Sequence, residues 1–271
     1  MHASFEPVDD WTAAYDNRAA VPTHEDYFYG WGRDAAAFRA AHAPETLAYG
    51  DGARERLDLF RPEGKPRGLA VFVHGGWWCH FGREYFSHMA AGPLAHGWAV
   101  AVPSYDLCPQ VRIATITAQV RAAVERAAQA VADGSLALAG HSAGGHLVAM
   151  MGCAETALAV ADRVSRIVAI SALADLRPLM RVAMNETLGI DAAEARTQSP
   201  ALLTPLAGPA LTAWVGGAET PEFLRQNRLL AAAFGGTMAA SVHEAPGENH
   251  FDVIGPLASA DSALTRAVVE A

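Results

Sequence analysis

Residues 136–150, LALAGHSAGGHLVAM, decide the fold of this chain. Residues 136–140 form an apolar run with the length and composition of a buried strand, and a helix is predicted from His146 to Cys153. Between them, residues 140–144 fit the pattern G-x-S-x-G, in which a tight strand-to-helix turn holds a serine hydroxyl above the sheet. The flanking glycines remove side chains that would clash in such a strained turn. The stretch therefore predicts an α/β protein with Ser142 as a nucleophile.

The alternation of strands and helices continues along the chain on both sides of this stretch. Residues 111–133 carry apolar side chains at helical spacing and precede Gly134, which is expected to stop the helix. Antiparallel strands are expected near residues 46–49 and 55–60. The pattern predicts a mostly parallel central sheet with helices on both faces. Its buried strands are predicted at residues 69–74, 98–103, 136–140, 166–170 and 210–215.

The composition of the 271-residue chain excludes several classes of protein. Hydrophobic residues make up 51% of the chain and charged residues 18%, which excludes an intrinsically disordered protein. At this length we expect a single domain, residues 1–271. No window approaches the roughly 18 consecutive apolar residues of a membrane span, so no membrane partner is expected. The net charge is −9, Lys65 is the single lysine and the arginines are scattered, which argues against a nucleic-acid partner.

The cysteines and the first residues predict a cytoplasmic protein. The three cysteines, Cys79, Cys108 and Cys153, are widely spaced and form no C-x-x-C pair, so neither a disulfide framework nor a zinc site is predicted. We expect reduced thiols, and we expect Cys79 to pack rather than to react. The stretch MHASFEPVDD lacks the basic segment and apolar run of a signal peptide. The sequence leaves the oligomeric state open, and a homodimer is compatible with it.

A second motif, His74-Gly75-Gly76-Trp77-Trp78, follows the predicted strand at residues 69–74. Acyl transfer through a tetrahedral intermediate needs hydrogen-bond donors aimed at the developing oxyanion, and a Gly-Gly turn lets backbone N–H groups approach it closely. One donor is assigned to Gly76 or Trp77, and the other to Ala143. His74 is expected to brace this loop rather than to transfer protons. The motif therefore predicts an oxyanion hole beside Ser142.

The general base and its acid follow from the order along the chain. After a nucleophile of this kind, the acid comes next and the histidine last, which leaves His243 and His250 as candidates for the base. His243 lies in the alternating run SVHEA, which is predicted as a strand, whereas His250 follows a loop. We therefore assign His250 as the base. Glu219, just beyond the run ALTAWV, is the expected acid, and its competitor Glu222 is expected to be a solvated charge in the first turn of a helix.

The insertion at residues 175–205 is predicted to form a small cap. Ligands of doubly wound sheets bind beyond the carboxyl ends of the strands, so a segment inserted there can roof the pocket. It contains LRPLMRVAMNETLGI, which is predicted as one amphipathic helix. Alternatively, this helix simply packs on the body of the protein. The two indoles of the second motif could likewise belong to the core instead of the pocket. The predicted substrate pocket comprises Trp77, Trp78, Met180, Met184 and Phe251.

Together these residues describe a serine hydrolase that needs no metal or cofactor. His250 takes the proton of Ser142 as the hydroxyl attacks a carbonyl carbon, Glu219 holds the imidazole, and water then cleaves the acyl-serine. No H-E-x-x-H motif and no other pairing at metal-ligand spacing occurs. The run YFYGWG at residues 27–32 has neither the preceding strand nor the third glycine of a dinucleotide site. The expected partner is a small molecule.

Seven stretches of the chain resemble the α/β-hydrolase type of kynurenine formamidase, or arylformamidase, within the broader esterase and lipase set. The resemblance implies the α/β-hydrolase fold and hydrolysis of N-formyl-L-kynurenine to L-kynurenine and formate in tryptophan breakdown, without a cofactor. It therefore also implies a small-molecule substrate with an aromatic leaving group. The stretches are YDNRAAVP at residues 15–22, HGGWW at 74–78, YDLCPQ at 105–110, GHSAGG at 140–145, DLRP at 175–178, PEFLRQ at 221–226 and NHF at 249–251.

The chain departs from this family pattern at two places. The family usually has Tyr-Trp where this chain has Trp77-Trp78, and it commonly has Asp where Glu219 stands. The longer acid can do the same chemistry, and the double indole bears on the choice of substrate. Because family members also often cleave small aryl esters, a carboxylesterase for short-acyl aryl esters is the runner-up. A non-catalytic homologue that only binds a ligand is the third interpretation, and the complete set of serine, acid, histidine and oxyanion loop argues against it.

Overall fold

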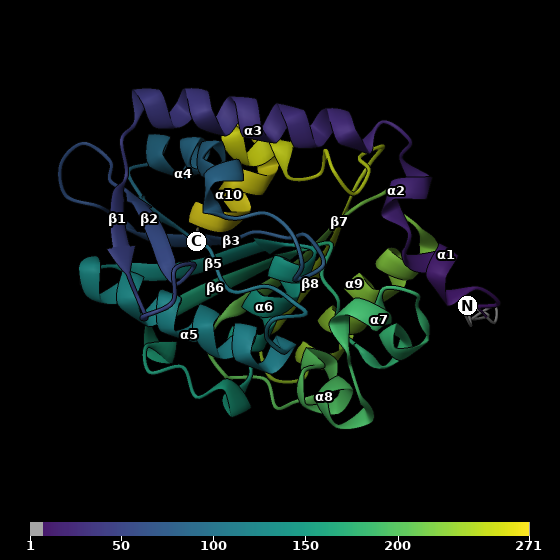
Figure 1. Cartoon of the computed structure of the whole chain (residues 1–271). Coiled ribbons are helices and arrows are strands. Elements are labelled where there is room, and N and C mark those ends of the chain that lie inside the picture. Colours follow the sequence, from purple (N-terminus) through teal and green to yellow (C-terminus); the bar gives the residue numbers. More distant parts are fainter. Residues whose placement is uncertain (1–7, 271) are drawn as a thin grey trace.

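Eight strands form one sheet in the computed structural model, which describes residues 8–270. Their order across the sheet is β1-β2-β4-β3-β5-β6-β7-β8 (Figure 1). The pairs β1–β2 and β2–β4 are antiparallel, and the remaining pairs are parallel. The strands are β1 Glu45–Ala48, β2 Arg56–Phe60, β3 Gly68–Val73, β4 Ala99–Pro103, β5 Ser135–His141, β6 Val164–Ile170, β7 Ala210–Gly216 and β8 Ala239–Ala245.

Helices cover both faces of this sheet, with α3, α4 and α10 on one face and α5, α6, α8 and α9 on the other (Figure 1). The prediction of a mostly parallel sheet between two helical layers is confirmed. The helices are α1 Trp11–Tyr15, α2 Asn17–Ala20, α3 His24–Ala41, α4 Ala91–Ala95, α5 Ile113–Ala130, α6 Ala143–Met151, α7 Asn185–Leu188, α8 Ala192–Thr197, α9 Pro221–Phe234 and α10 Ala263–Val269.

The two helical layers explain why the central strands are apolar throughout. In β3, alternate side chains point to opposite faces, so Leu69 and Val71 join the core beneath α5 and α6, whereas Ala70 and Phe72 join the core beneath α3 and α10. All six residues of the strand are buried. A strand with both faces covered is expected to be a continuous hydrophobic run rather than an alternating one. The carboxyl ends of the central strands lie together at one edge of the sheet, and the polar residues at these ends form the site.

The cap segment is not the single amphipathic helix that the sequence predicted. It consists of a 3-10 turn at Arg177–Arg181 and the short helix α7, separated by Val182 in an extended conformation with φ −89° and ψ 150°. α7 ends at Gly189, whose φ is 65°. The Asn185 side chain bonds both backbone groups of Ile190, which fixes this sharp turn. The segment packs against α1, α5 and α9.

The N-terminal part of the structure holds three helices that the sequence analysis did not identify. The longest is α3, which runs along one face of the molecule (Figure 1). Trp31 and Ala35 are its buried residues and pack into the core on that face. No helix within residues 8–270 is both long and apolar enough to cross a membrane.

His74 and His146 are buried in the core in the neutral form, which predicts that acid destabilises the protein. Burial lowers the pKa of His74 and of His146 from 6.5 to about 4. The unfolded chain therefore binds more protons than the folded protein between pH 6.5 and pH 4. Stability from these groups is present above pH 6.5 and is lost as the pH falls, by about 1.4 kcal/mol per pH unit for each histidine. Urea unfolding at several pH values measures this slope.

The variant His146→Gln separates this effect from the titration of carboxylates in the same range. A glutamine can still donate a hydrogen bond to the Gln198 carbonyl, which His146 Nε2 contacts at 2.7 Å. We expect the variant to lose stability less steeply between pH 6.5 and pH 4, by about 1.4 kcal/mol per pH unit. If the free energy of unfolding depends on pH in the same way in both proteins, His146 does not contribute to the loss of stability in acid.

Candidate active site

Ser142 lies in the turn between β5 and α6, with φ 56° and ψ −117°. A positive φ is uncommon for a residue with a side chain and occurs at strained functional turns. The glycines of the motif make the turn sterically feasible: a Cβ at Gly140 would clash with the backbone of Gly144, and a Cβ at Gly144 would clash with the Val73 carbonyl. α6 begins at Ala143, so the predicted start at His146 is wrong. The helix N-terminus therefore adjoins the serine directly.

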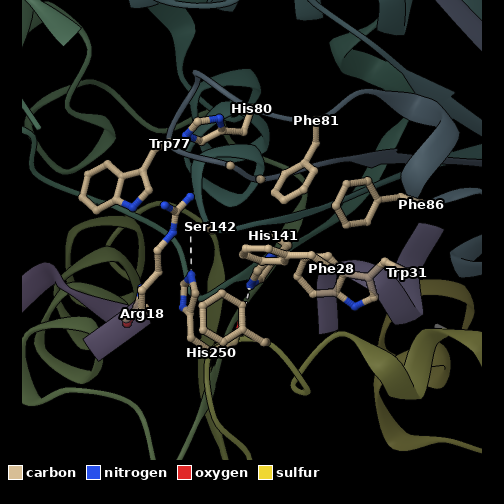
Figure 2. Close-up of a pocket in the computed structure, with 14 residues that line it drawn as sticks. Arg18, Phe28, Trp31, Trp77, His80, Phe81, Phe86, His141, Ser142 and His250 are labelled. Carbon is tan, nitrogen blue, oxygen red and sulfur yellow. Dashed lines mark hydrogen bonds between the residues drawn. The ribbon is translucent and has the colours of Figure 1, made fainter. Parts of the chain in front are cut away.

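A chain of hydrogen bonds connects Ser142 to a buried carboxylate. His250 Nε2 lies 3.1 Å from Ser142 Oγ (Figure 2), and His250 Nδ1 lies 2.6 Å from Glu219 Oε2. All three residues are buried. The other carboxylate oxygen of Glu219 accepts hydrogen bonds from Ser171 Oγ at 2.5 Å and from the Gly216 N–H at 2.8 Å. Glu219 is thus fixed on the loop after β7, and its geometry is that of an acid orienting an imidazole.

The loop after β3 approaches the serine from the other side. Gly76 has φ 107° and Trp77 has φ 54°, and the Gly76 carbonyl accepts hydrogen bonds from the backbone N–H groups of Cys79 and His80. A Cβ at Gly75 would lie 3.0 Å from Ser142 Cβ, so the loop touches the nucleophile. Within residues 8–270, the N–H groups of Gly76, Trp77 and Ala143 donate to no other backbone group. These donors are thus available to a ligand.

His74 braces this loop, as the sequence predicted. Its ring stacks on Tyr105 with centroids 4.4 Å apart, and Nδ1 lies 2.8 Å from the Gly75 carbonyl oxygen. The Tyr105 hydroxyl in turn donates to the His74 carbonyl at 2.8 Å. Since its pKa is lowered to about 4 by burial, His74 stays neutral near pH 7.

The serine opens into a pocket with mostly aromatic walls (Figure 2). The walls come from the loop after β3, from the loop that carries His250, and from the N-terminal helices α2 and α3. No Asp or Glu belongs to the lining formed by the described residues. The lining residues are Asn17, Arg18, Phe28, Trp31, Gly75, Gly76, Trp77, His80, Phe81, Phe86, His141, Ser142, His250 and Phe251.

Comparison with known protein families matches this architecture to one of them. The model of the BD-FAE family matches residues 57–199, more than half of the chain, including the loop after β3 and the serine turn. This chain belongs to the BD-FAE family. As an α/β-hydrolase it shares its fold with EstE1, a carboxylesterase cloned from a metagenomic library, at 17% identity and a TM-score of 0.70 over 90% of this chain and 97% of that one.

Two further relatives of this BD-FAE member cover most of its length. A protein from Silicibacter sp. TM1040, provisionally described as a thioesterase, is 46% identical, with a TM-score of 0.90 over 94% of this chain and 97% of that one. The kynurenine formamidase of Salmo salar is 29% identical over 247 residues, which cover 86% of this chain and 84% of the relative. The resemblance to kynurenine formamidases is thereby confirmed.

Three residues predicted for the pocket lie elsewhere. Trp78 is fully buried in the core, where its ring meets the His146 ring edge-on at 5.2 Å, and only Trp77 reaches the pocket. Met180 is exposed, and Met184 packs at the margin of the core. The cause is the broken helix of the cap segment: residues 175–205 contribute nothing to the lining. The prediction that this segment roofs the pocket does not agree with the structure.

The roof is formed instead by Phe28 and Trp31 of α3, which the sequence analysis missed. Both lie in the aromatic run YFYGW at residues 27–31. Their i, i+3 spacing, which places two side chains on one face of a helix, was the available signal. Phe251 joins them, with ring centroids 5.6 Å from Phe28 and 6.2 Å from Trp31.

The two candidates that were not chosen, one for the base and one for the acid, lie away from the serine. His243 lies on β8, where its ring stacks on Trp214 at 3.6 Å. Glu222 accepts a hydrogen bond from the Tyr15 hydroxyl at 2.5 Å and pairs with Arg225 at 2.7 Å. It is therefore a buried, bonded carboxylate, and its expected role as a solvated charge is wrong. Burial and the Glu222 charge together raise the pKa of Tyr15.

His141, adjacent to the serine, is a further residue that the sequence analysis did not single out. Its Nε2 lies 2.8 Å from the His250 carbonyl oxygen, and the two rings are 4.7 Å apart. Burial, followed by the neighbouring His250, lowers the pKa of His141 well below its ordinary value. The neutral ring donates its Nε2–H to that carbonyl and so positions the loop that carries His250.

The potential metal-ligating side chains of the described residues are scattered. No group of three or more His, Cys, Asp or Glu side chains within residues 8–270 is arranged to hold a metal ion. Cys79, Cys108 and Cys153 carry free thiols. The chemistry that this arrangement supports is attack by an activated serine.

Proposed function

We propose that this protein is a serine hydrolase that cleaves the formyl amide of N-formyl-L-kynurenine to L-kynurenine and formate. The observation that carries the proposal is the hydrogen-bonded series Glu219–His250–Ser142, with its serine opening into an aromatic pocket. The similarity to the Salmo salar kynurenine formamidase over most of both chains supports the substrate. On this proposal the enzyme acts in the cytoplasm on a small molecule, without a cofactor, a membrane or a nucleic acid.

The proposed reaction begins with proton transfer. His250 Nε2, 3.1 Å from Ser142 Oγ, accepts the hydroxyl proton as Oγ bonds to the formyl carbon. Glu219 keeps the proton of Nδ1 in place and stabilises the imidazolium. The imidazolium then donates its proton to the departing aryl amine, which leaves a formyl-serine. Water, deprotonated by the same histidine, releases formate and restores the serine.

Two backbone N–H groups are proposed to stabilise the oxyanion of both tetrahedral intermediates. Ala143 supplies the first from the start of α6, and Gly76 or Trp77 supplies the second from the loop after β3. Their support is the unused N–H groups and the contact of Gly75 with Ser142. Fixed donors of this kind typically account for about 3 kcal/mol of transition-state stabilisation each.

The deciding experiment compares two activities of one preparation. Formate release from N-formyl-L-kynurenine and hydrolysis of phenyl acetate are measured side by side, with Ser142→Ala as the blank. We expect the higher kcat/KM for N-formyl-L-kynurenine. Fast hydrolysis of phenyl acetate without formate release would favour the second candidate, a carboxylesterase for short-acyl aryl esters, which the fold shared with EstE1 also allows. If the wild-type protein shows neither activity, a homologue that only binds a ligand is favoured.

The acyl group is expected to be short. Bulky rings, including Phe28, Trp31, Phe81 and Phe86, line the pocket that contains the serine, and we expect them to leave little room for an alkyl chain. In a series of 4-nitrophenyl esters, kcat/KM should fall by about tenfold or more from acetyl to octanoyl. Initial rates of nitrophenolate release measure the series. A maximum at octanoyl would contradict the prediction and indicate a lipase-like esterase.

A further inference from the structure

Two polar side chains of the pocket have no part in the reaction proposed above. Asn17 and Arg18 both belong to α2, the short helix Asn17–Ala20, and both line the pocket that contains Ser142. Asn17 is only 5% exposed, yet its side-chain amide makes no hydrogen bond to any residue between 8 and 270. The amide nitrogen and oxygen of Asn17 are not among the fully buried, unpartnered atoms of residues 8–270, so they remain accessible from the pocket. The free donor and acceptor of this amide are thus available to a ligand.

Arg18 lies beside it at the mouth of the pocket. Figure 2 shows its side chain extending into the pocket toward Trp77. The guanidinium carbon lies 5.8 Å from the centroid of the Phe28 ring, a cation–π contact that limits its orientation. Among the described residues, Arg18 forms no ion pair: the neighbouring Asp16 carboxylate accepts from the Ala19 N–H at the start of α2. The charge of Arg18 is therefore uncompensated.

The electrostatics of the pocket differ from those of the whole protein. The chain carries a net charge of −9. Arg18 is nevertheless the single permanently charged side chain in the described pocket lining. Burial and the nearby Arg18 charge lower the pKa of His80, so this wall carries no second cation near pH 7. An acidic protein with one uncompensated guanidinium at its binding site favours an anionic ligand group there.

We propose that Arg18 and Asn17 form a carboxylate subsite, which selects substrates that carry a carboxylate on the aromatic leaving group. A guanidinium presents parallel N–H donors that match the two oxygens of a carboxylate, and the Asn17 amide adds a further donor. The inference rests on the proposed function, in which the scissile formyl group lies at Ser142 and the amino-acid end of the leaving group extends toward α2. The subsite would distinguish acylated aromatic amino acids from neutral aryl amides.

Two substrates that differ only in the charged end test this subsite. N-formyl-L-kynurenine carries the amino acid, and 2-formamidoacetophenone has the same formyl aryl amide without it. For Arg18→Gln, we expect kcat/KM for N-formyl-L-kynurenine to fall roughly 10- to 100-fold, mainly through KM, because the lost interaction is made equally before and during the reaction. The neutral substrate should change by less than about threefold. Arg196→Gln, which removes the same charge from an exposed position on α8, is the matched control.

Salt provides a second measurement on the unaltered protein. Since Arg18 is exposed, its attraction for a carboxylate is screened by added salt. The KM for N-formyl-L-kynurenine should therefore rise between 0.01 and 1 M NaCl (roughly 30 Å and 3 Å Debye length) in the wild type. The KM for 2-formamidoacetophenone should not follow it, and Arg18→Gln should abolish the difference. Equal losses on both substrates would mean a structural role for Arg18 and would overturn the proposal, as would no loss on either.

Failure of the proposed function gives a different result from failure of the subsite. If the wild-type protein releases no formate from either amide, the proposed function is wrong, and the subsite is then tested with esters. The pair is 3-acetoxybenzoate, whose leaving group carries a carboxylate, and phenyl acetate, whose leaving group is neutral. A selective rise of KM for 3-acetoxybenzoate in Arg18→Gln supports the subsite on an esterase. Equal kinetics for the two esters in wild type and variant overturn it.

Discussion

Replacing Ser142 with alanine should lower kcat by roughly 10⁴ to 10⁶, and His250→Ala should cost nearly as much. The two losses should be similar because the serine is a weak nucleophile unless His250, 3.1 Å away, takes its proton. For the same reason, the double variant should be little worse than either single one. Single-turnover measurements of formate release, made with high enzyme concentrations, cover the required range.

The strained turn calls for a second serine variant. At φ 56°, alanine keeps the strain of the native residue, whereas glycine adopts this conformation without cost. Ser142→Gly should therefore fold at least as well as Ser142→Ala and should be equally inactive. Thermal unfolding of both variants serves as the control for folding. A residual kcat within about tenfold of wild type in folded Ser142→Gly would refute the serine mechanism.

The elements predicted most closely from the sequence are those that local rules determine. The serine turn needs Gly140 and Gly144 because any Cβ there would meet backbone, and such a requirement is visible in the sequence itself. Strands such as β5 and β7 are apolar because both faces of the sheet are covered, which also appears as a local pattern. Chain order then selected Glu219 and His250, and the structure brings both to Ser142.

The elements that the sequence did not reveal depend on contacts between distant segments. Trp77 and Trp78 are identical neighbours, and two successive residues with positive φ direct one into the pocket and the other into the core. The burial of Glu222 depends on the Tyr15 hydroxyl, 207 positions earlier in the chain. The roof depends on α3 covering one face of the sheet in such a way that Phe28 reaches Phe251. No pattern within one segment encodes such packing.

The second large effect is expected at the acid. Glu219→Ala should lower kcat by roughly 10³ to 10⁴, less than the loss of the serine, because His250 remains but loses the group that fixes its Nδ1 proton. Glu219→Asp, which keeps a carboxylate at this position, should retain more activity than Glu219→Ala. Its shorter side chain keeps the charge near His250 but must shift from the donors at Ser171 and Gly216. Steady-state kinetics should rank kcat in the order wild type, Glu219→Asp, Glu219→Ala.

Glu222→Gln is the matched control, three residues along the same stretch. The amide still accepts the hydrogen bond of the Tyr15 hydroxyl but no longer pairs as a charge with Arg225. We expect kcat to stay within several-fold of wild type. The free energy of unfolding should fall by about 1 to 3 kcal/mol, because the buried partners of Glu222 lose part of their hydrogen bonding and charge pairing. Glu219→Ala should show the opposite pattern, in which kcat falls far more than the free energy of unfolding. If Glu222→Gln is the more damaging to kcat while remaining folded, Glu219 is not the acid.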